Sequence, residues 1–406
     1  MRMHLVLLAL ALGCGEAEDK TNTGMGADTD TGVQDQVDSG VESDSGAEAN
    51  ADTVEACTGE FVILTEEDFE PIEHCTVIHG SLELGPGGPS TRGQDGEEDA
   101  EQSSTLTHLE PLSNLTEVTG DLWIGGNGSL PSFSLDSLST LGGTLNVGDN
   151  NLLTSFSLDS LTAIGGGFSV HQNPALTTFS LADLSTIEFG MGVTYNDALT
   201  TFSLDSLETI NGSIADSGLF IALNDDLTSF SFASLTTVNG PLWVGCLNFM
   251  GSEADFTANK SLTSFSMDNL RHVDGELLIA ESPNLRSFSL DSLSSIGGDL
   301  NLGPNSTLTS FSLENLSSVG GDLVIAYNEA LPSFSIDGLT SIGGYLGIGE
   351  NDVLTSFSLN SLSSISSTIR IEANPALCES LVAAFVDEME ALGWSEEVTT
   401  AENADC

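Results

Sequence analysis

The stretch SFSLDSL occupies Ser132–Leu138 and occurs again at Ser155–Leu161 and Ser287–Leu293, and a near copy, TFSLDSL, fills Thr201–Leu207. An active site needs its chemical groups once, so repetition on this scale indicates architecture. The phenylalanine of the stretch recurs mostly every 23 residues, and a period of this size predicts a solenoid of stacked units. The repeat phenylalanines are Phe133, Phe156, Phe179, Phe202, Phe230, Phe265, Phe288, Phe311, Phe334 and Phe357.

Each unit contains two short segments with the alternation of a β-strand. The unit Leu285–Thr307 reads LRSFSLDSLSSIGGDLNLGPNST, in which F-S-L and G-x-L-x-[IVL] have a period of two. Glycine pairs such as Gly297-Gly298 mark the turn before the second strand. No unit contains a long helical run, so we expect an all-β parallel solenoid with turns of about 23 residues.

An asparagine follows the G-x-L-x-[IVL] strand at the same period. Stacked asparagine side chains can bond the backbone of a turn and the asparagine of the next turn. We therefore expect an asparagine ladder alongside a stack of phenylalanines inside the solenoid. Its members are Asn127, Asn150, Asn173, Asn196, Asn305, Asn328, Asn351 and Asn374.

The composition limits the partners of this protein. The 406 residues include 61 acidic and 7 basic side chains, which gives a formal net charge of −54. Such a surface repels nucleic acid and anionic lipid headgroups and attracts cations. We therefore expect no nucleic-acid partner.

The N-terminus is typical of an export signal. Residues 1–14, MRMHLVLLALALGC, place one arginine before an apolar run that is too short to span a bilayer. The sequence Ala11–Cys14 resembles a bacterial lipobox, which predicts that Cys14 is lipidated and attaches the protein to a membrane. An ordinary secretory signal, cleaved nearby, is the alternative. Gly15, in place of an aspartate, favours the outer membrane, and exposure of the rod at the cell surface stays open.

Residues 15–56 are acidic and almost free of large apolar side chains. Such a segment cannot bury enough surface to offset chain entropy, so we expect a disordered tether between the anchor and the folded part.

Cysteines mark both ends of the solenoid, which we place at residues 57–374. Two disulfides, Cys57–Cys75 and Cys378–Cys406, fit an exported protein whose open ends need caps. Cys246 is left over, and we expect it to be a buried thiol. Residues 375–406 begin with a helical pattern that ends at Gly393 and predicts a capping helix. The apolar positions of this pattern are Leu377, Leu381, Phe385, Met389 and Leu392.

The opening of the repeat region resembles the receptor L domain of the insulin and epidermal growth factor receptors. In that family a cysteine pairs with a second one just before a V-x-x-G-x-L-x-I strand. The matching positions here are Cys57, Cys75, Val77, Gly80, Leu82 and Leu84. The resemblance covers residues 57 to about 378 and implies a right-handed parallel β-helix related to leucine-rich repeats. It also implies a habit of binding proteins, but the cysteine-rich module and kinase of those receptors are missing, so ligand identity does not transfer.

One row of carboxylates follows the repeat phenylalanine by three residues. Such a row offers oxygen ligands that suit calcium, whereas the alternative is a screened row on an acidic surface with no metal. We favour the second interpretation and expect no cofactor. The candidate ligands are Asp136, Asp159, Asp205, Asp268, Asp291 and Asp337, with Glu314 in the same row.

Binding is better predicted at exposed aromatic residues. Trp123 and Trp243 occupy the same outward position of the G-x-L-x-[IV] strand, where other units have Asn, Ser, Gly, Val or Arg. Exposed tryptophans often anchor a protein or a sugar ring, although a neighbouring loop can also cover them. Insertions at residues 85–104, 211–218 and 245–260 interrupt the repeat, and the last adds Phe249 and Lys260 as binding candidates.

A polysaccharide-processing β-helix enzyme is the main alternative function. Hydrolases of this kind need a tuned pair of carboxylates in a groove, and regular repetition argues against such a pair. The five histidines of the solenoid region have no metal-ligand spacing. We therefore predict a lipid-anchored, non-enzymatic envelope protein whose solenoid serves in recognition, adhesion or envelope structure, with a protein or glycan ligand.

Overall fold

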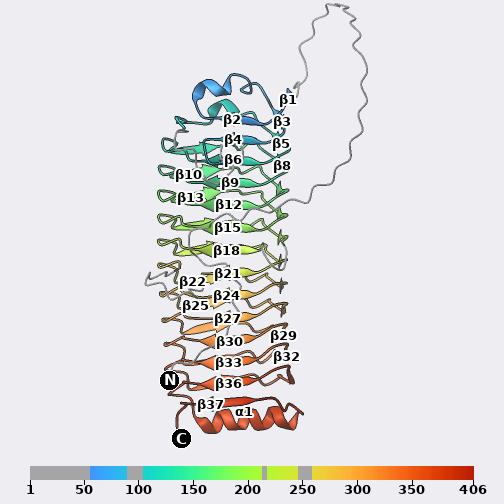
Figure 1. Ribbon diagram of the computed structural model, residues 1–406, viewed down its shortest axis with the longest axis vertical. Helices are drawn as coiled ribbons and strands as arrows, with labels where there is room; N and C mark the ends of the chain where they lie inside the picture. The colour runs from blue at the N-terminus through green and yellow to red at the C-terminus, as the bar shows by residue number, and fades with distance from the viewer. Residues whose placement is uncertain (1–54, 89–103, 213–216, 246–257) are drawn as a thin grey trace, which may run out of the picture.

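The protein forms a straight stack of about twelve β-solenoid turns of about 23 residues (Figure 1). This computed structural model describes residues 55–88, 104–212, 217–245 and 258–406. The lipidation candidate Cys14, Cys246, Phe249 and residues 15–54 of the predicted tether lie outside the described residues, whereas Ala56, the last residue of that tether, begins the first strand. Most residues of the three insertions also lie outside the described ranges.

The G-x-L-x-[IVL] segments form one 14-stranded parallel sheet in which each strand pairs with its equivalents in the turns before and after. In order, the strands are β2 (Phe61–Ile63), β4 (Leu82–Leu84), β6 (Leu122–Gly125), β9 (Leu145–Gly148), β12 (Phe168–His171), β15 (Met191–Thr194), β18 (Leu219–Ala222), β21 (Leu242–Val244), β24 (Leu277–Ile279), β27 (Leu300–Leu302), β30 (Leu323–Ala326), β33 (Leu346–Gly349), β36 (Ile369–Glu372) and β37 (Val398–Ala401).

The phenylalanine segments form a second face of eight plus two strands, each running Ser/Thr-Phe-Ser with the ring inward. Its strands are β7 (Ser132–Ser134), β10 (Ser155–Ser157), β13 (Thr178–Ser180), β16 (Thr201–Ser203), β19 (Ser229–Ser231), β22 (Ser264–Ser266), β25 (Ser287–Ser289) and β28 (Ser310–Ser312), then β31 (Ser333–Ser335) and β34 (Ser356–Ser358).

A third face, which our sequence analysis missed, is a 13-stranded sheet of mostly two-residue strands before the glycine turn. Two residues are too few to show a period, which explains the omission. Its strands are β1 (Ala56–Thr58), β3 (Val77–His79), β5 (Glu117–Val118), β8 (Thr140–Leu141), β11 (Ala163–Ile164), β14 (Thr186–Ile187), β17 (Thr209–Ile210), β20 (Thr237–Val238), β23 (His272–Val273), β26 (Ser295–Ile296), β29 (Ser318–Val319), β32 (Ser341–Ile342) and β35 (Ser364–Ile365).

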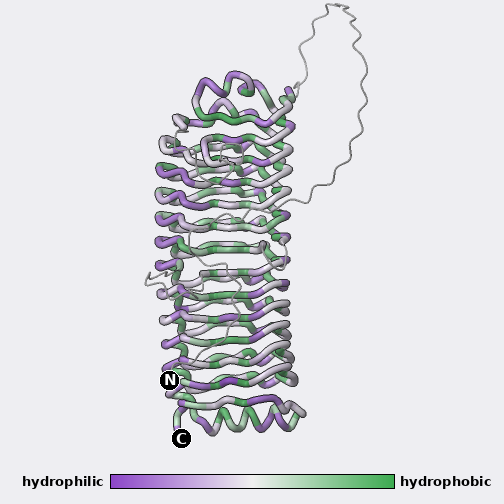
Figure 2. Tube along the Cα trace, in the orientation of Figure 1, coloured by the Kyte–Doolittle hydropathy of each residue, from purple (hydrophilic) through white to green (hydrophobic). Residues whose placement is uncertain are grey.

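The core repeats with the turns. Figure 2 shows hydrophobic residues recurring at matching places along the stack. The ten repeat phenylalanines form a column in which neighbouring rings are nearly parallel, with centroids 5.1 to 5.9 Å apart. The edge of Phe385 closes this column, because its ring meets Phe357 at 5.3 Å in a T-shaped contact.

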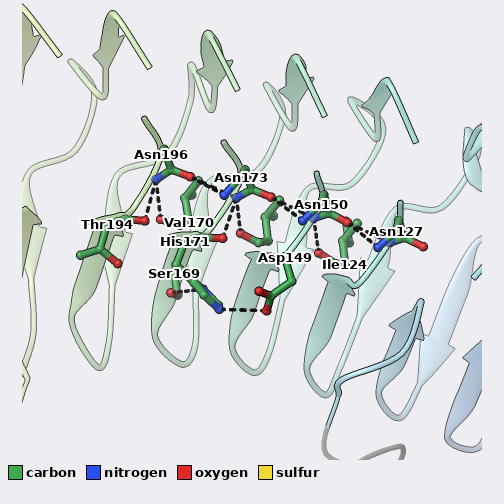
Figure 3. A network of polar contacts seen from close by, with 11 residues as sticks. Ile124, Asn127, Asp149, Asn150, Ser169, Val170, His171, Asn173, Thr194 and Asn196 are labelled. Atoms are coloured by element: carbon green, nitrogen blue, oxygen red, sulfur yellow. Dashed lines mark hydrogen bonds and ion pairs between the residues drawn. The ribbon is translucent and has the colours of Figure 1, made fainter. Parts of the chain in front are cut away.

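Buried asparagines form a second column at one corner (Figure 3). Asn150 is typical: its backbone N–H and its Nδ2 both donate to Asn173 Oδ1 at 3.1 Å, and Nδ2 also donates to Ile124 O at 2.9 Å. Beyond the predicted members the column includes Asn224, Asn259 and Asn403, which the insertions and the C-terminal helix had put out of register. Ser282 replaces an asparagine at one position.

The residue before most column positions is strained. Nine non-glycine residues there, eight before an asparagine and Glu281 before Ser282, have φ between 51° and 59°, in the left-handed region that L-residues rarely adopt. Asp149, Gln172 and Tyr195 are examples. The asparagine bonds therefore hold a corner that the chain alone would avoid.

Both ends are closed. At the N-terminus, β1 and β2 form a turn before the strand at Leu82, and the 3₁₀ helix η1 (Glu66–Phe69) follows them. A second 3₁₀ helix, η2, spans Glu110–Leu112. At the C-terminus, α1 (Glu379–Ala391) underlies the last turn and β37 then pairs with β36, a strand that the sequence analysis missed (Figure 1).

The predicted helix is present, and Leu377 and Met389 are buried as predicted, but the face between them is displaced by one residue. Val382, Val386 and Met389 are buried, whereas Leu381 and Leu392 are exposed. Asn403, beyond the helix, accepts from Asn374 and donates Nδ2 to the carboxylate of Glu379 at 3.1 Å. Among the described residues, none of the helices has the length and apolar character needed to cross a bilayer.

One proline interrupts the phenylalanine face. In six other turns a threonine at this position donates its N–H and its hydroxyl to the carbonyl of the preceding turn, as Thr355 does to Pro332 at 2.9 and 3.1 Å. Pro332 has neither donor, so it cannot bond Thr309 O. The face accordingly divides between β28 and β31.

Replacing Asn173 by alanine should lower the free energy of unfolding by about 2–4 kcal/mol, because buried donors and an acceptor in two neighbouring turns lose their partners. Chemical denaturation measures this. Asn114→Ala, at an exposed site, is the control and should change stability by less than about 0.5 kcal/mol. A loss no larger than that of the control would contradict a stabilising role for the column.

Replacing Pro332 by threonine should restore two hydrogen bonds to Thr309 O. The expected gain is about 1 kcal/mol, since two bonds outweigh the greater entropy of the unfolded chain. Amide exchange in β31 should slow. Pro131→Thr is the matched control, because Pro131 precedes the edge strand β7 and so lacks an upstream strand of the same sheet to bond. Equal responses of the two variants would show that Pro332 does not open the face.

Candidate binding surface

Trp123 and Trp243 both lie at the predicted outward position, in the middle of β6 and β21 on the 14-stranded sheet. Both side chains are half-buried, and their indole nitrogens are inaccessible to solvent. The rings are therefore partly covered anchors rather than fully exposed ones.

A groove of about 320 Å³ lies beside Trp123. Its walls are acidic and polar, and they include Glu60, Glu83, Asp121 and Asn146. A carboxylate-lined groove with one indole suits a ligand that donates hydrogen bonds and presents one apolar face.

His171 lies next to Trp123, with ring centroids 6.4 Å apart. Its Nδ1 is 3.0 Å from Ser169 Oγ, and its Nε2 is 3.8 Å from Asp149 Oδ2 (Figure 3). This Ser-His-Asp group resembles a nucleophilic triad in composition only. The His–Asp distance is too long for an orienting hydrogen bond, and Ser169 lies on the same strand as His171.

Trp243 belongs to a second cluster. Phe220 occupies the same outward position in β18 and meets Trp243 in a T-shaped contact at 5.2 Å. Phe220 was not among the predicted binding residues, although counting from Gly218-Leu219 after the insertion places it in register. Burial is the main cause that raises the pKa of the nearby Glu276, which accepts from Asn301 Nδ2 at 2.5 Å.

Lys260 is engaged rather than free. Its ammonium donates to Asp225 Oδ2 at 2.6 Å, and this bond raises the pKa of Lys260. The pKa of Asp197 is raised by burial and by the nearby Asp225 charge, so Lys260 offsets repulsion between two carboxylates. That Lys260 binds a ligand stays a prediction.

The carboxylate row joins consecutive turns. Asp205 Oδ1 accepts from Ser231 Oγ at 2.5 Å and from the backbone N–H of Ala233 at 3.0 Å, and Asp337 makes the same two bonds with Ser358 and Asn360. Asp136 accepts the N–H of Asp159, while other members bond serines of the next turn. Those members are Asp159, which bonds Ser180, Asp268, which bonds Ser289, and Asp291, which bonds Ser312.

These bonds give the row a structural explanation that requires no metal. In the described part of the chain, the only group of three or more His, Cys, Asp or Glu ligand atoms within 4.8 Å of one another is Cys57, His74 and Cys75. Its two cysteines form a disulfide, so that group does not provide metal-binding thiolates.

The hydrogen bond from Ser231 lowers the pKa of Asp205, and bonds from Ser203 and Ala233 add to the effect against burial. Ionised Asp205 thus stabilises the fold above its ordinary pKa of about 3.9, and this contribution disappears as the pH falls below that value. Asp205→Asn should therefore flatten the acid limb of the stability–pH curve, measured by urea unfolding.

Asp352→Asn removes an equal charge at an exposed position outside the row, and it should leave the acid limb steeper than Asp205→Asn does. If the two variants gave the same curve, the hydrogen bonds of Asp205 would not matter. A stability gain in calcium beyond that in sodium chloride of equal ionic strength would instead indicate that the row binds the ion.

Both disulfides are present in the structure. Cys57 bonds Cys75 across the first turn, and Cys378 bonds Cys406 where the chain ends beside α1. Each bridge ties a terminal segment to the solenoid, where frayed strands would otherwise be exposed.

The sequence matches no family profile, and no curated protein is similar to it in sequence. Among solved structures, the chain aligns with a leucine-rich repeat protein from Bacteroides ovatus over 87% of this chain and 93% of that chain, at 11% identity and a TM-score of 0.19. A likeness at this level supports no inference about function. The fold therefore rests on the strand pairings themselves.

Proposed function

We propose that this protein is an exported, lipid-anchored component of the cell envelope whose solenoid is a recognition or adhesion module. The observation that carries the proposal is the pair of tryptophans at one outward position of the repeat, where only Phe220 among the other described turns is also aromatic. A repeat keeps an outward aromatic residue only where something covers it or binds it.

The acidic surface narrows the ligand. A net charge of −54 disfavours nucleic acid and other polyanions, so the ligand is a protein or a glycan that is neutral or basic. The apolar segment ending at Cys14 and the acidic stretch after it support the anchor and the tether. Gly15 supports the outer membrane as the destination.

The proposed role is non-catalytic. The aspartates of the row form hydrogen bonds between turns. In the Ser169–His171–Asp149 group, the distance of 3.8 Å between His171 Nε2 and Asp149 Oδ2 is too long for a hydrogen bond. Both arrangements favour display of a surface over turnover of a substrate.

Cys14→Ala should move the protein from the membrane fraction to the soluble fraction and abolish labelling by a fatty-acid probe. The acyl chains are the expected membrane attachment, and a single residue carries them. Cys246→Ala is the matched control and should leave both readouts unchanged. Persistent membrane attachment with lipid labelling in Cys14→Ala would refute the anchor.

Combined Trp123→Ala and Trp243→Ala substitutions should weaken adhesion of the purified solenoid to intact cells by about tenfold or more, as loss of two interfacial anchors does. Val324→Ala, at the same outward position in β30, is the control. Unchanged adhesion in the double variant would remove the observation on which the proposal rests. Release of sugar fragments from an acidic polysaccharide would favour the enzymatic alternative.

A further inference from the structure

The contact between two successive turns differs from the others along the rod. The earlier turn contains β27, β28 and β29, and the later one contains β30, β31 and β32. Pro332 leaves β28 and β31 unpaired. The asparagine column is also broken here, because Asn305 donates its N–H to Tyr327 O at 3.3 Å and Asn328 Oδ1 is buried without a partner.

A groove of about 640 Å³ lies over this joint, across β28, β31 and β34. Eight of the ten column phenylalanines are buried, and the two half-buried ones, Phe311 and Phe357, both line the groove. Phe311 borders the break and Phe357 lies on β34, the last strand of the face, so the groove has an apolar strip with two partly exposed rings.

Hydroxyl groups border this strip. Each of the three strands across the groove has a serine on either side of its phenylalanine, so Ser333 and Ser335 flank Phe334, and β28 and β34 repeat the pattern. The result is a strip of ring edges between two ranks of hydroxyls, which runs across the strands along the rod.

Glu314 adds an acceptor. It occupies the aspartate position of the carboxylate row, lies exposed at the groove, and makes no hydrogen bond with another described residue, whereas the aspartates of the row bond the next turn. Among the residues that the structure describes, no cationic side chain lines the groove. Two repeat positions therefore differ from the usual residue near this groove: Pro332 replaces a threonine, and Glu314 replaces an aspartate.

We propose that this groove binds a neutral, hydroxyl-rich oligosaccharide chain that lies along the rod axis. A pyranose ring has an apolar C–H face and hydroxyls around its edge. The C–H face matches the phenylalanine strip, the edge hydroxyls match the two serine ranks, and Glu314 accepts from a pair of them. The absence of a cation from the lining and the net charge of −54 argue against an acidic glycan.

The test measures binding of four uncharged hexasaccharides with different linkages (cellohexaose, laminarihexaose, maltohexaose and mannohexaose) to the purified chain by calorimetry. At least one should bind at millimolar concentration or below. Ser333→Tyr, which fills the groove, and Glu314→Gln, which removes the acceptor charge, should each weaken that binding about tenfold, as loss of contacts worth about 1.4 kcal/mol does.

Ser287→Tyr is the matched control, because Ser287 holds the same position in the regular strand β25 and should leave binding unchanged. Pro332→Thr provides a second route, since it should close the groove without touching a lining side chain and should weaken binding while raising stability. If none of the four sugars binds at millimolar concentration, or if Ser333→Tyr binds as tightly as the unmodified chain, the proposal is wrong.

A basic peptide is the alternative ligand, because the negative net charge of the protein would attract it. Binding of hexalysine, lost in Glu314→Gln, with no sugar bound, would assign the groove to basic peptides instead. The groove lies on the phenylalanine face, so it is separate from Trp123 and Trp243 and does not depend on the lipid anchor. Sugar binding that survives the double tryptophan substitution would separate the two proposals.

Discussion

The rest of the fold depends on the corner at which the chain leaves each strand of the 14-stranded sheet. At most of these corners one residue adopts the left-handed conformation, at a cost of roughly 1–2 kcal/mol for a non-glycine residue. The next residue, an asparagine, fixes the corner by bonding the backbone of its own and the preceding turn and the asparagine of the following turn. Because one side chain connects three turns, the strain of a corner is offset only when the neighbouring turns are already in place. This coupling makes the stack cooperative, as expected for a solenoid whose units contact only their neighbours.

The fold was largely predictable because its information is local and repeated. The spacing of Phe133, Phe156 and Phe179 gives the period, and the period gives parallel in-register pairing. Elements outside the repeat were harder to predict. The strand β37 pairs only after α1 has reversed the chain, and the buried face of α1 is set by its contact with the last turn, where Val382 packs in place of Leu381. Neither contact has a signal in the surrounding sequence.

The candidate site was predictable in part. The register identified the outward position of Trp123 and Trp243, but not how far each ring is covered, since that depends on packing between distant segments. The sequence showed the carboxylate row as a repeated pattern but did not show what the carboxylates bond. The serines that bond them lie about 21 residues further along the chain, and the sequence indicated those serines only as parts of the phenylalanine strand. Pro332 is visible in the sequence as a departure from the repeat, and such a departure shows where the hydrogen bonds between neighbouring strands stop. Only the structure shows that a groove lies at that point.

The asparagine column also gives the rod an electrical direction. Each Nδ2 points to the Oδ1 of the following turn, so the side-chain amide dipoles are aligned head to tail and their fields add within each unbroken run, as peptide dipoles do in a helix. The donor end of the last run is Asn403, where the carboxylate of Glu379 accepts its amide. Glu379 is also the first residue of α1, where the positive end of the helix dipole lies. The negative charge of Glu379 therefore neutralises two positive poles at once, so one carboxylate stabilises both the end of the asparagine run and the start of the helix.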